Sequence, residues 1–91
     1  IVRWPGRVAA GSVSDRISGF EDWMPTILSA VNDAAAVPAG IDGISLLPTV
    51  LGERQEPRPL LYREFSGYGG QQAIRVGEWK AIRTRPSPSC R

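Results

Sequence analysis

Residues 71–84 read QQAIRVGEWKAIRT, two runs of strand-forming character on either side of Gly77 and Glu78. Glycine at the first of two central residues is typical of a type II′ turn, whose twist matches that of the strands it joins. The stretch therefore predicts an antiparallel β-hairpin. Residues 60–65, LLYREF, supply a further strand candidate, so residues 60–84 are expected to form a small antiparallel sheet.

Upstream of this sheet, apolar residues recur at helical spacing between Ile17 and Val31. Pro25 has no amide hydrogen and is tolerated only in the first turn of a helix. A helix from about Trp23 to Val31, capped by Asp22, satisfies this restriction.

A second short helix is expected after Ser45, which can cap the first turn. Pro48 would lie near the start of this helix, and Gly52 would end it. Residues 1–4, IVRW, read as a short strand closed by the turn-forming pair that follows, and residues 13–20 as a strand or extended approach. The expected fold is α+β, with one or two helices packed on a strand and followed by the antiparallel sheet.

The organisation expected along the chain has four parts. Residues 1–52 hold the expected helices, and residues 53–59 form a polar linker. Residues 60–84 make the small sheet. Residues 85–91, with two prolines, are expected to be an extended tail.

The composition excludes several classes of function. Lys and Arg exceed Asp and Glu by only two and are scattered along the 91 residues, so nucleic acid is not an expected partner. No apolar run approaches the roughly 18 residues of a membrane span, and no membrane contact is expected. The chain contains no histidine and one cysteine, Cys90, so it offers neither a disulfide framework nor an imidazole base.

The remaining side chains give no catalytic constellation. Cys90 lacks a base that would lower its pKa, and the carboxylates do not recur at metal-ligand spacing. Asp22 and Asp42 are interpreted as a helix cap and a turn residue. We therefore predict no catalytic residue and no metal ligand in this chain.

Five blocks stand in a definite order along the chain: IVRWPG at 1–6, GSVSD at 11–15, DWMPTIL at 22–28, IDGISLLP at 41–48 and QAIRVGEWKAIR at 72–83. In this order and at these spacings, the blocks closely resemble the C-terminal part of the arylsulfatase-type sulfatases, which are alkaline-phosphatase-like in fold. The resemblance extends to about Thr84. It implies a C-terminal fragment of a sulfatase, a hydrolase of sulfuric esters, in which residues 1–52 would be the end of the main α/β domain.

Further expectations follow from this resemblance. Sulfatases of this kind use a formylglycine, made within a Cys/Ser-x-Pro-x-Arg motif, and a calcium ion, and both belong to sequence that precedes the position matched by Ile1. We therefore expect no cofactor in this chain, no activity of the chain alone, and a sulfate-ester substrate only in the full-length enzyme. Enzymes of this family are often exported, but the sequence leaves the compartment of this chain open.

The resemblance also indicates residues that could contact substrate, because loops of the small sheet can reach the rim of the substrate cleft in such enzymes. The candidates are Glu64, Phe65, Tyr68, Gln71 and Gln72. Their alternative is a purely structural role in the loop.

Two other functions stay open at this point. A small binding or assembly domain could contact an anionic glycan or a protein through the hairpin residues Arg75, Trp79, Lys80 and Arg83, and the same cations could serve a nucleic acid. Cations on an edge hairpin also protect against aggregation. Self-association of the isolated chain, through a strand edge or the apolar face of the first helix, is expected if the chain is a piece of a larger fold.

Overall fold

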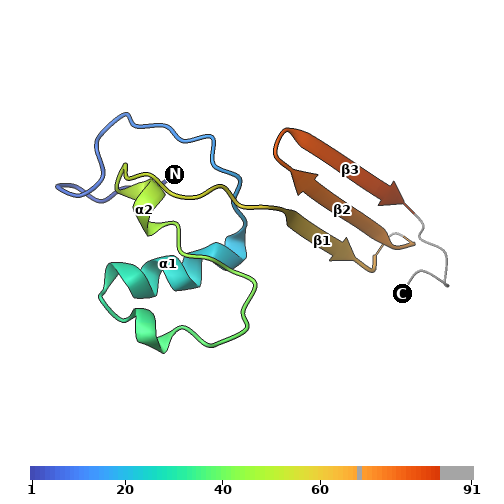
Figure 1. The fold of residues 1–91 in the computed structure, drawn as a ribbon, viewed down its shortest axis with the longest axis horizontal. Coiled ribbons are helices and arrows are strands. Elements are labelled where there is room, and N and C mark those ends of the chain that lie inside the picture. Colours follow the sequence, from blue (N-terminus) through green and yellow to red (C-terminus); the bar gives the residue numbers. More distant parts are fainter. Residues whose placement is uncertain (68, 85–91) are drawn as a thin grey trace. The chain divides into compact units, whose positions relative to one another are not determined.

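The computed structural model describes residues 1–67 and 69–84, in two compact units that divide at Pro57 and Arg58. The first unit holds two short 3₁₀ helices and two α-helices, and the second holds three strands (Figure 1). This content confirms the expected α+β class with its small antiparallel sheet. The expected tail at 85–91 lies outside the described residues.

The first helix, α1, spans Trp23–Ala30 and follows the 3₁₀ helix η1, Phe20–Asp22. The expected helix is thus confirmed to within one residue at its end. Asn32 has a left-handed φ of 61°, and the amide of Asp33 donates to the carbonyl of Leu28 at 2.8 Å. This is a Schellman motif, which uses a left-handed residue to satisfy the last carbonyls of a helix.

Asp22 occupies the predicted N-cap position of α1, but its side chain does not cap the helix. Asp22 has helical backbone angles and makes no side-chain bond to the first turn of α1, because η1 runs directly into the helix. Its side chain is completely buried. The carboxylate instead accepts hydrogen bonds from the amide of Gly19, at 2.9 Å, and from the amide of Ile44, at 3.0 Å.

Thr26 makes a second link between the segment around Asp22 and the segment at residues 44–46. The buried hydroxyl of Thr26 donates to the carbonyl of Asp22 at 2.6 Å and accepts from the amide of Leu46 at 2.8 Å. Leu46 and Pro25 are the buried apolar residues among those that the structure describes. The core of the first unit therefore combines two buried apolar residues with a hydrogen-bonded network, in which the buried side chains of Asp22 and Thr26 both have partners.

Gly43 allows the close approach that this network needs. A Cβ atom at position 43 would lie 2.7 Å from the carbonyl carbon of Glu21, and closer still to the carbonyl oxygen. Only glycine fits where two backbones meet at this distance.

The second helix, α2, spans Leu47–Val50 and is held at both ends. Leu46, and not the expected Ser45, is the N-cap of α2, and the hydroxyl of Ser45, one residue earlier, accepts from the amide of Leu47 at 3.3 Å. Gly52 has a φ of 79°, and the amide of Glu53 donates to the carbonyl of Pro48 at 2.8 Å, so Gly52 ends the helix as predicted. Farther along, the side-chain amide of Gln55 donates to the carbonyl of Ser45 at 2.7 Å.

The strand expected at residues 1–4 is not present in the structure, and residues 13–20 include no strand either. A strand is defined by hydrogen bonds to a neighbour, and all strand pairing of the described residues lies between 61 and 84. Residues 13–18 are instead irregular and lead into η1. The predicted turn at Pro5 and Gly6 does form, and the amide of Val8 donates to the carbonyl of Trp4 at 2.9 Å.

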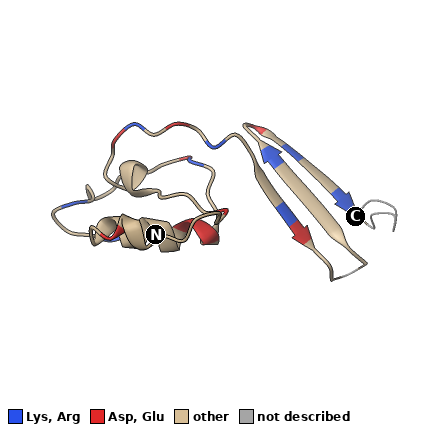
Figure 2. Cartoon of the chain, turned by 60° about the horizontal axis from the view of Figure 1, so that its bottom comes forward, with Lys and Arg blue, Asp and Glu red and all other residues tan. Residues whose placement is uncertain are grey.

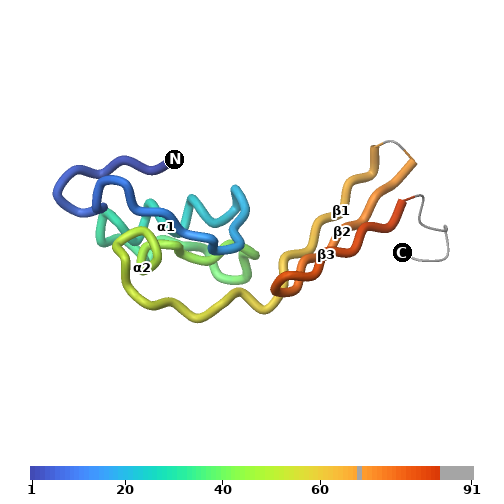
Figure 3. The backbone as a smooth tube through the Cα atoms, turned by 90° about the horizontal axis from the view of Figure 1, so that it is seen from above, coloured from blue at the N-terminus to red at the C-terminus, as the bar shows by residue number. Residues whose placement is uncertain are grey.

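The second unit is an antiparallel sheet in the order β1-β2-β3, comprising Leu61–Phe65, Gln71–Val76 and Trp79–Thr84 (Figure 3). Val76 pairs with Trp79 across a two-residue connection, and Gly77 has a φ of 56°. A positive φ at the first central residue, with none at Glu78, is the geometry of the predicted type II′ turn.

Candidate functional site

The register of the three strands divides their side chains between two faces, because successive residues of a strand point to opposite sides. Glu64 pairs with Gln72, which pairs with Arg83, and Tyr62 pairs with Ile74, which pairs with Ala81. We call this side the Tyr62 face: Tyr62, Glu64, Gln72, Ile74, Val76, Trp79, Ala81 and Arg83. The opposite side is the Phe65 face: Leu61, Arg63, Phe65, Gln71, Ala73, Arg75, Lys80, Ile82 and Thr84.

The predicted substrate-contact residues do not gather at one point. Glu64 and Gln72 lie side by side on the Tyr62 face, whereas Phe65 and Gln71 are paired on the Phe65 face. The fifth candidate, Tyr68, lies outside the described residues. The ring of Phe65 packs over Gly67, where a Cβ would meet it at 2.6 Å, so Phe65 also shapes the turn after β1.

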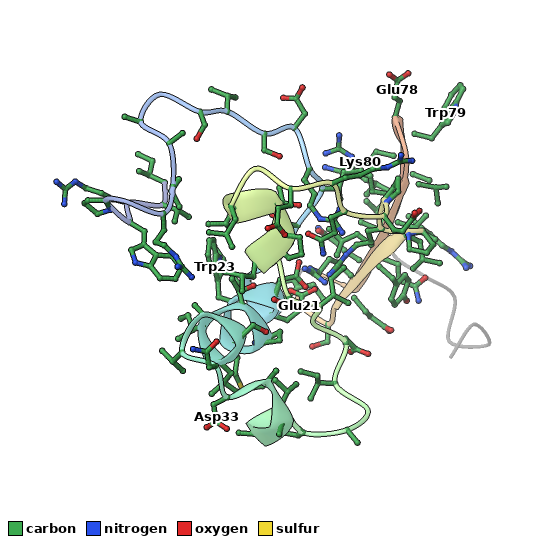
Figure 4. The ribbon with its side chains drawn as sticks, turned by 60° about the vertical axis from the view of Figure 1, so that its left-hand side comes forward. Glu21, Trp23, Asp33, Glu78, Trp79 and Lys80 are labelled. Atoms are coloured by element: carbon green, nitrogen blue, oxygen red, sulfur yellow. The ribbon has the colours of Figure 1, made fainter. Side chains whose placement is uncertain are left out.

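The four hairpin residues of the alternative function are divided in the same way. Arg75 pairs with Lys80 on the Phe65 face, whereas Trp79 and Arg83 belong to the Tyr62 face. Figure 2 shows cations along all three strands. Figure 4 shows Trp79 at the tip of the hairpin, where its side chain is 84% exposed. The four residues therefore do not make one continuous patch.

Tyr62 adjoins two of the predicted contact residues, and the sequence did not single it out. Its hydroxyl donates to Oε2 of Glu64 at 3.1 Å. Desolvation and the adjoining carboxylate raise the pKa of the Tyr62 hydroxyl above 10.0, while a hydrogen bond with Gln72 acts in the opposite direction. The hydroxyl therefore stays protonated at neutral pH and acts as a donor. The only signal in the sequence was the spacing of two residues between Tyr62 and Glu64, which puts both on one face of a strand.

A shallow hollow of about 240 Å³ lies in the sheet unit. The residues that line it are Tyr62, Gln72, Ala73, Ile74, Ala81, Ile82 and Arg83. Five of these seven belong to the Tyr62 face. The hollow thus has an apolar floor, formed by Ile74 and Ala81, and three polar side chains around it.

The carboxylates of the chain do not form a metal centre within residues 1–67 and 69–84, where no three potential ligand residues come together. Asp22, the buried carboxylate, is already engaged by two backbone amides. The described residues therefore do not fit the calcium ion that the sulfatase resemblance implies. No helix in this part of the chain has the length and apolar character of a bilayer-spanning segment.

Comparison with known proteins identifies the family to which the chain is similar. No family model matches the chain. Among curated proteins, it is 37% identical over 83 residues to N-acetylgalactosamine-6-sulfatase of Canis lupus familiaris, a match that covers 89% of this chain. It is 35% identical to arylsulfatase A of Bos taurus over 86% of the chain, and 32% identical to N-acetylglucosamine-6-O-sulfatase of Bacteroides thetaiotaomicron over 82%.

These matches confirm the resemblance seen in the five sequence blocks: the chain is a fragment of sulfatase sequence. The chain spans about 15% of the length of the curated relatives it matches. N-acetylgalactosamine-6-sulfatases from several mammals are among the most similar of these relatives, at 35% to 39% identity.

Proposed function

We propose that this chain is part of an enzyme that hydrolyses sulfate esters. In this proposal the chain supplies scaffold and substrate contacts but not the reacting groups. The observation that carries the proposal is the similarity to sulfatases along 89% of the chain. Ester hydrolysis needs a nucleophile, a proton-transfer group and cations that stabilise developing negative charge in one pocket. The described residues offer no such pocket, and we assign those groups to sulfatase sequence outside the matched segment.

Formylglycine and calcium belong to that other sequence in this proposal. In the sulfatases that the chain resembles, formylglycine is the nucleophile and calcium binds the sulfate. In this proposal, no residue of this chain supplies the formylglycine or binds the calcium ion.

The substrate class proposed for the whole enzyme is a sulfated amino sugar. Two of the three relatives compared are named for the 6-sulfate of an N-acetylated hexosamine. The segment's share in binding it is proposed to come from the sheet residues Glu64, Phe65, Gln71 and Gln72, together with Tyr68, which lies outside the described residues. Residues at the adjoining ends of β1 and β2 suit such contacts, because a rigid sheet positions them.

The proposal predicts that the 91-residue chain alone releases no sulfate from a chromogenic aryl sulfate, with or without added calcium. The measurement is the absorbance of the liberated phenol, at chain concentrations high enough to detect a rate slightly above the uncatalysed one. A full-length arylsulfatase A serves as the positive control. Turnover by the purified chain that depends on its folding would overthrow the assignment of chemistry to other sequence.

Self-association of the isolated chain is also proposed, through the apolar stripe that α1 and η1 leave in solvent. Phe20, Met24, Ile27 and Val31 follow one another at helical spacing and are 46% to 91% exposed. Burying such a stripe against a second copy would remove apolar surface from water. Sedimentation should therefore report an apparent mass that rises with protein concentration. The Ile27→Lys variant should have a lower apparent mass at the same concentration. A monomer of constant mass at millimolar concentration would contradict this.

A further inference from the structure

The hollow on the Tyr62 face combines features that suit a small polar ring. Its volume of about 240 Å³ is below the roughly 300 to 1,000 Å³ of sites for drug-sized ligands. A single sugar ring therefore suits it better than an extended ligand. Ile74 and Ala81 offer an apolar floor for the C–H surface of such a ring, and polar groups at the edge can bind its hydroxyl groups.

The polar edge is ordered before any ligand arrives. The hydroxyl of Tyr62 is held by Glu64 at 3.1 Å and interacts with the side chain of Gln72. Glu64 does not line the hollow itself but adjoins it through its hydrogen bond to Tyr62. It retains acceptor capacity for sugar hydroxyls, because a carboxylate has about four lone-pair positions, and the amide of Gln72 both donates and accepts. Side chains that are already positioned lose less conformational entropy when a ligand binds.

The charge of the sheet favours an anionic ligand. Residues 61–84 carry four cations, Arg63, Arg75, Lys80 and Arg83, against two acids, Glu64 and Glu78. Residues 1–57 carry four arginines against seven acids, so the small basic excess of the chain comes from its C-terminal part. Arg83 is the cation that lines the hollow. A guanidinium matches the oxygens of a sulfate or carboxylate group by paired hydrogen bonds.

From these observations we propose that the Tyr62 face binds one anionic sugar unit. The ring lies over Ile74 and Ala81, and its hydroxyl groups meet Glu64 and Gln72. Its charged group meets Arg83. This inference rests on the proposed function for the class of substrate, and it assigns this one sugar unit to the face of the sheet that carries Glu64 and Gln72, which is opposite to the face of Phe65 and Gln71.

The test uses the isotopically labelled 91-residue chain and titrates it with N-acetylglucosamine 6-sulfate. The side-chain amide signals of Gln72 and Gln71 report the two faces separately, since the two residues are neighbours in sequence but point to opposite sides. The Gln72 signals should move and saturate, while the Gln71 signals stay nearly constant. Unsulfated N-acetylglucosamine should bind about tenfold more weakly, because it lacks the charged partner of Arg83.

A matched pair of variants separates a specific site from general attraction of anions. Arg83→Gln and Lys80→Gln remove one charge each from β3, on opposite faces. Arg83→Gln should weaken binding about tenfold, and Lys80→Gln should leave it within about twofold, as befits an exposed charge away from the site. Equal loss in both variants, equal movement of the two glutamine signals, or shifts that do not saturate would each overturn the inference.

The outcome is independent of catalysis. Sulfate-ester hydrolysis by an enzyme that contains this segment, without saturable binding at the Tyr62 face, would remove this inference and leave the proposed function standing. Binding at that face in the absence of any such hydrolysis would remove the proposed function and leave the binding of a sugar unit standing.

Discussion

Replacing Asp22 by Ala is expected to destabilise the first unit by about 3 to 5 kcal/mol, since each buried backbone donor left without a partner costs about 1 to 3 kcal/mol. The Asp22 carboxylate is the acceptor for two such donors, the amides of Gly19 and Ile44. The side chain is fully buried, so water cannot take its place without a cavity opening. A loss of this size is a large share of the 5 to 15 kcal/mol that stabilises a typical domain. The measurement is urea unfolding followed by the fluorescence of the tryptophans.

The Asp22→Asn variant separates the effect of losing hydrogen-bond acceptors from the effect of losing side-chain volume. Asparagine fills the same space but offers one oxygen acceptor, and its NH₂ group would face an amide hydrogen. We expect a loss of about 2 kcal/mol, smaller than that of the Ala variant. The exposed Asp33 provides the matched control, and Asp33→Ala should change stability by less than about 0.5 kcal/mol. If Asp22→Ala and Asp33→Ala lost the same stability, the buried carboxylate would not hold the two segments together.

Gly43→Ala is expected to be the second most damaging change, with a loss of about 3 kcal/mol or more, at the upper end of overpacking effects. The added methyl group would meet the backbone carbonyl of Glu21, which cannot move aside as a flexible side chain could. The separation of the two segments would have to increase. This would also stretch the bond from the amide of Ile44 to Asp22.

Gly52→Ala is the comparison that shows whether crowding is the cause. A Cβ at position 52 would meet nothing within 4 Å, and its cost comes only from the φ of 79°. That cost is about 1 to 2 kcal/mol for a residue with a side chain. The midpoint temperature of thermal unfolding of the Gly43→Ala variant should therefore be well below that of Gly52→Ala. The reverse order would show that residues 21 and 43 are not in close backbone contact.

The elements that follow local rules could be predicted from the sequence. Pro25 limits where α1 can begin, Gly52 ends α2, and Gly77 favours one type of hairpin turn. Each of these effects acts within a few residues of its cause, so the sequence pattern contains it.

The contacts between distant residues could not be predicted in this way. Ile44 lies 22 residues from Asp22, and nothing in the local pattern of Asp22 distinguishes a helix cap from a buried bridge between segments. The strand expected at residues 1–4 failed for a related reason, because a strand requires a neighbour that the local sequence does not specify. The split of the candidate site residues between two faces became visible only when the register of β1, β2 and β3 was known.

Whether this chain can perform the role of a sulfatase segment is tested most directly by exchange. The 83 matched residues of the dog N-acetylgalactosamine-6-sulfatase are replaced by their counterparts from this chain, and sulfate release from the sulfated sugar is measured. A second exchange carrying Asp22→Ala serves as the control for loss of the fold. We predict that the first exchanged enzyme folds and hydrolyses the ester, and that the second does not. An exchanged enzyme that is folded, loaded with its nucleophile and metal, and nevertheless inactive would contradict the assignment of this chain to that role.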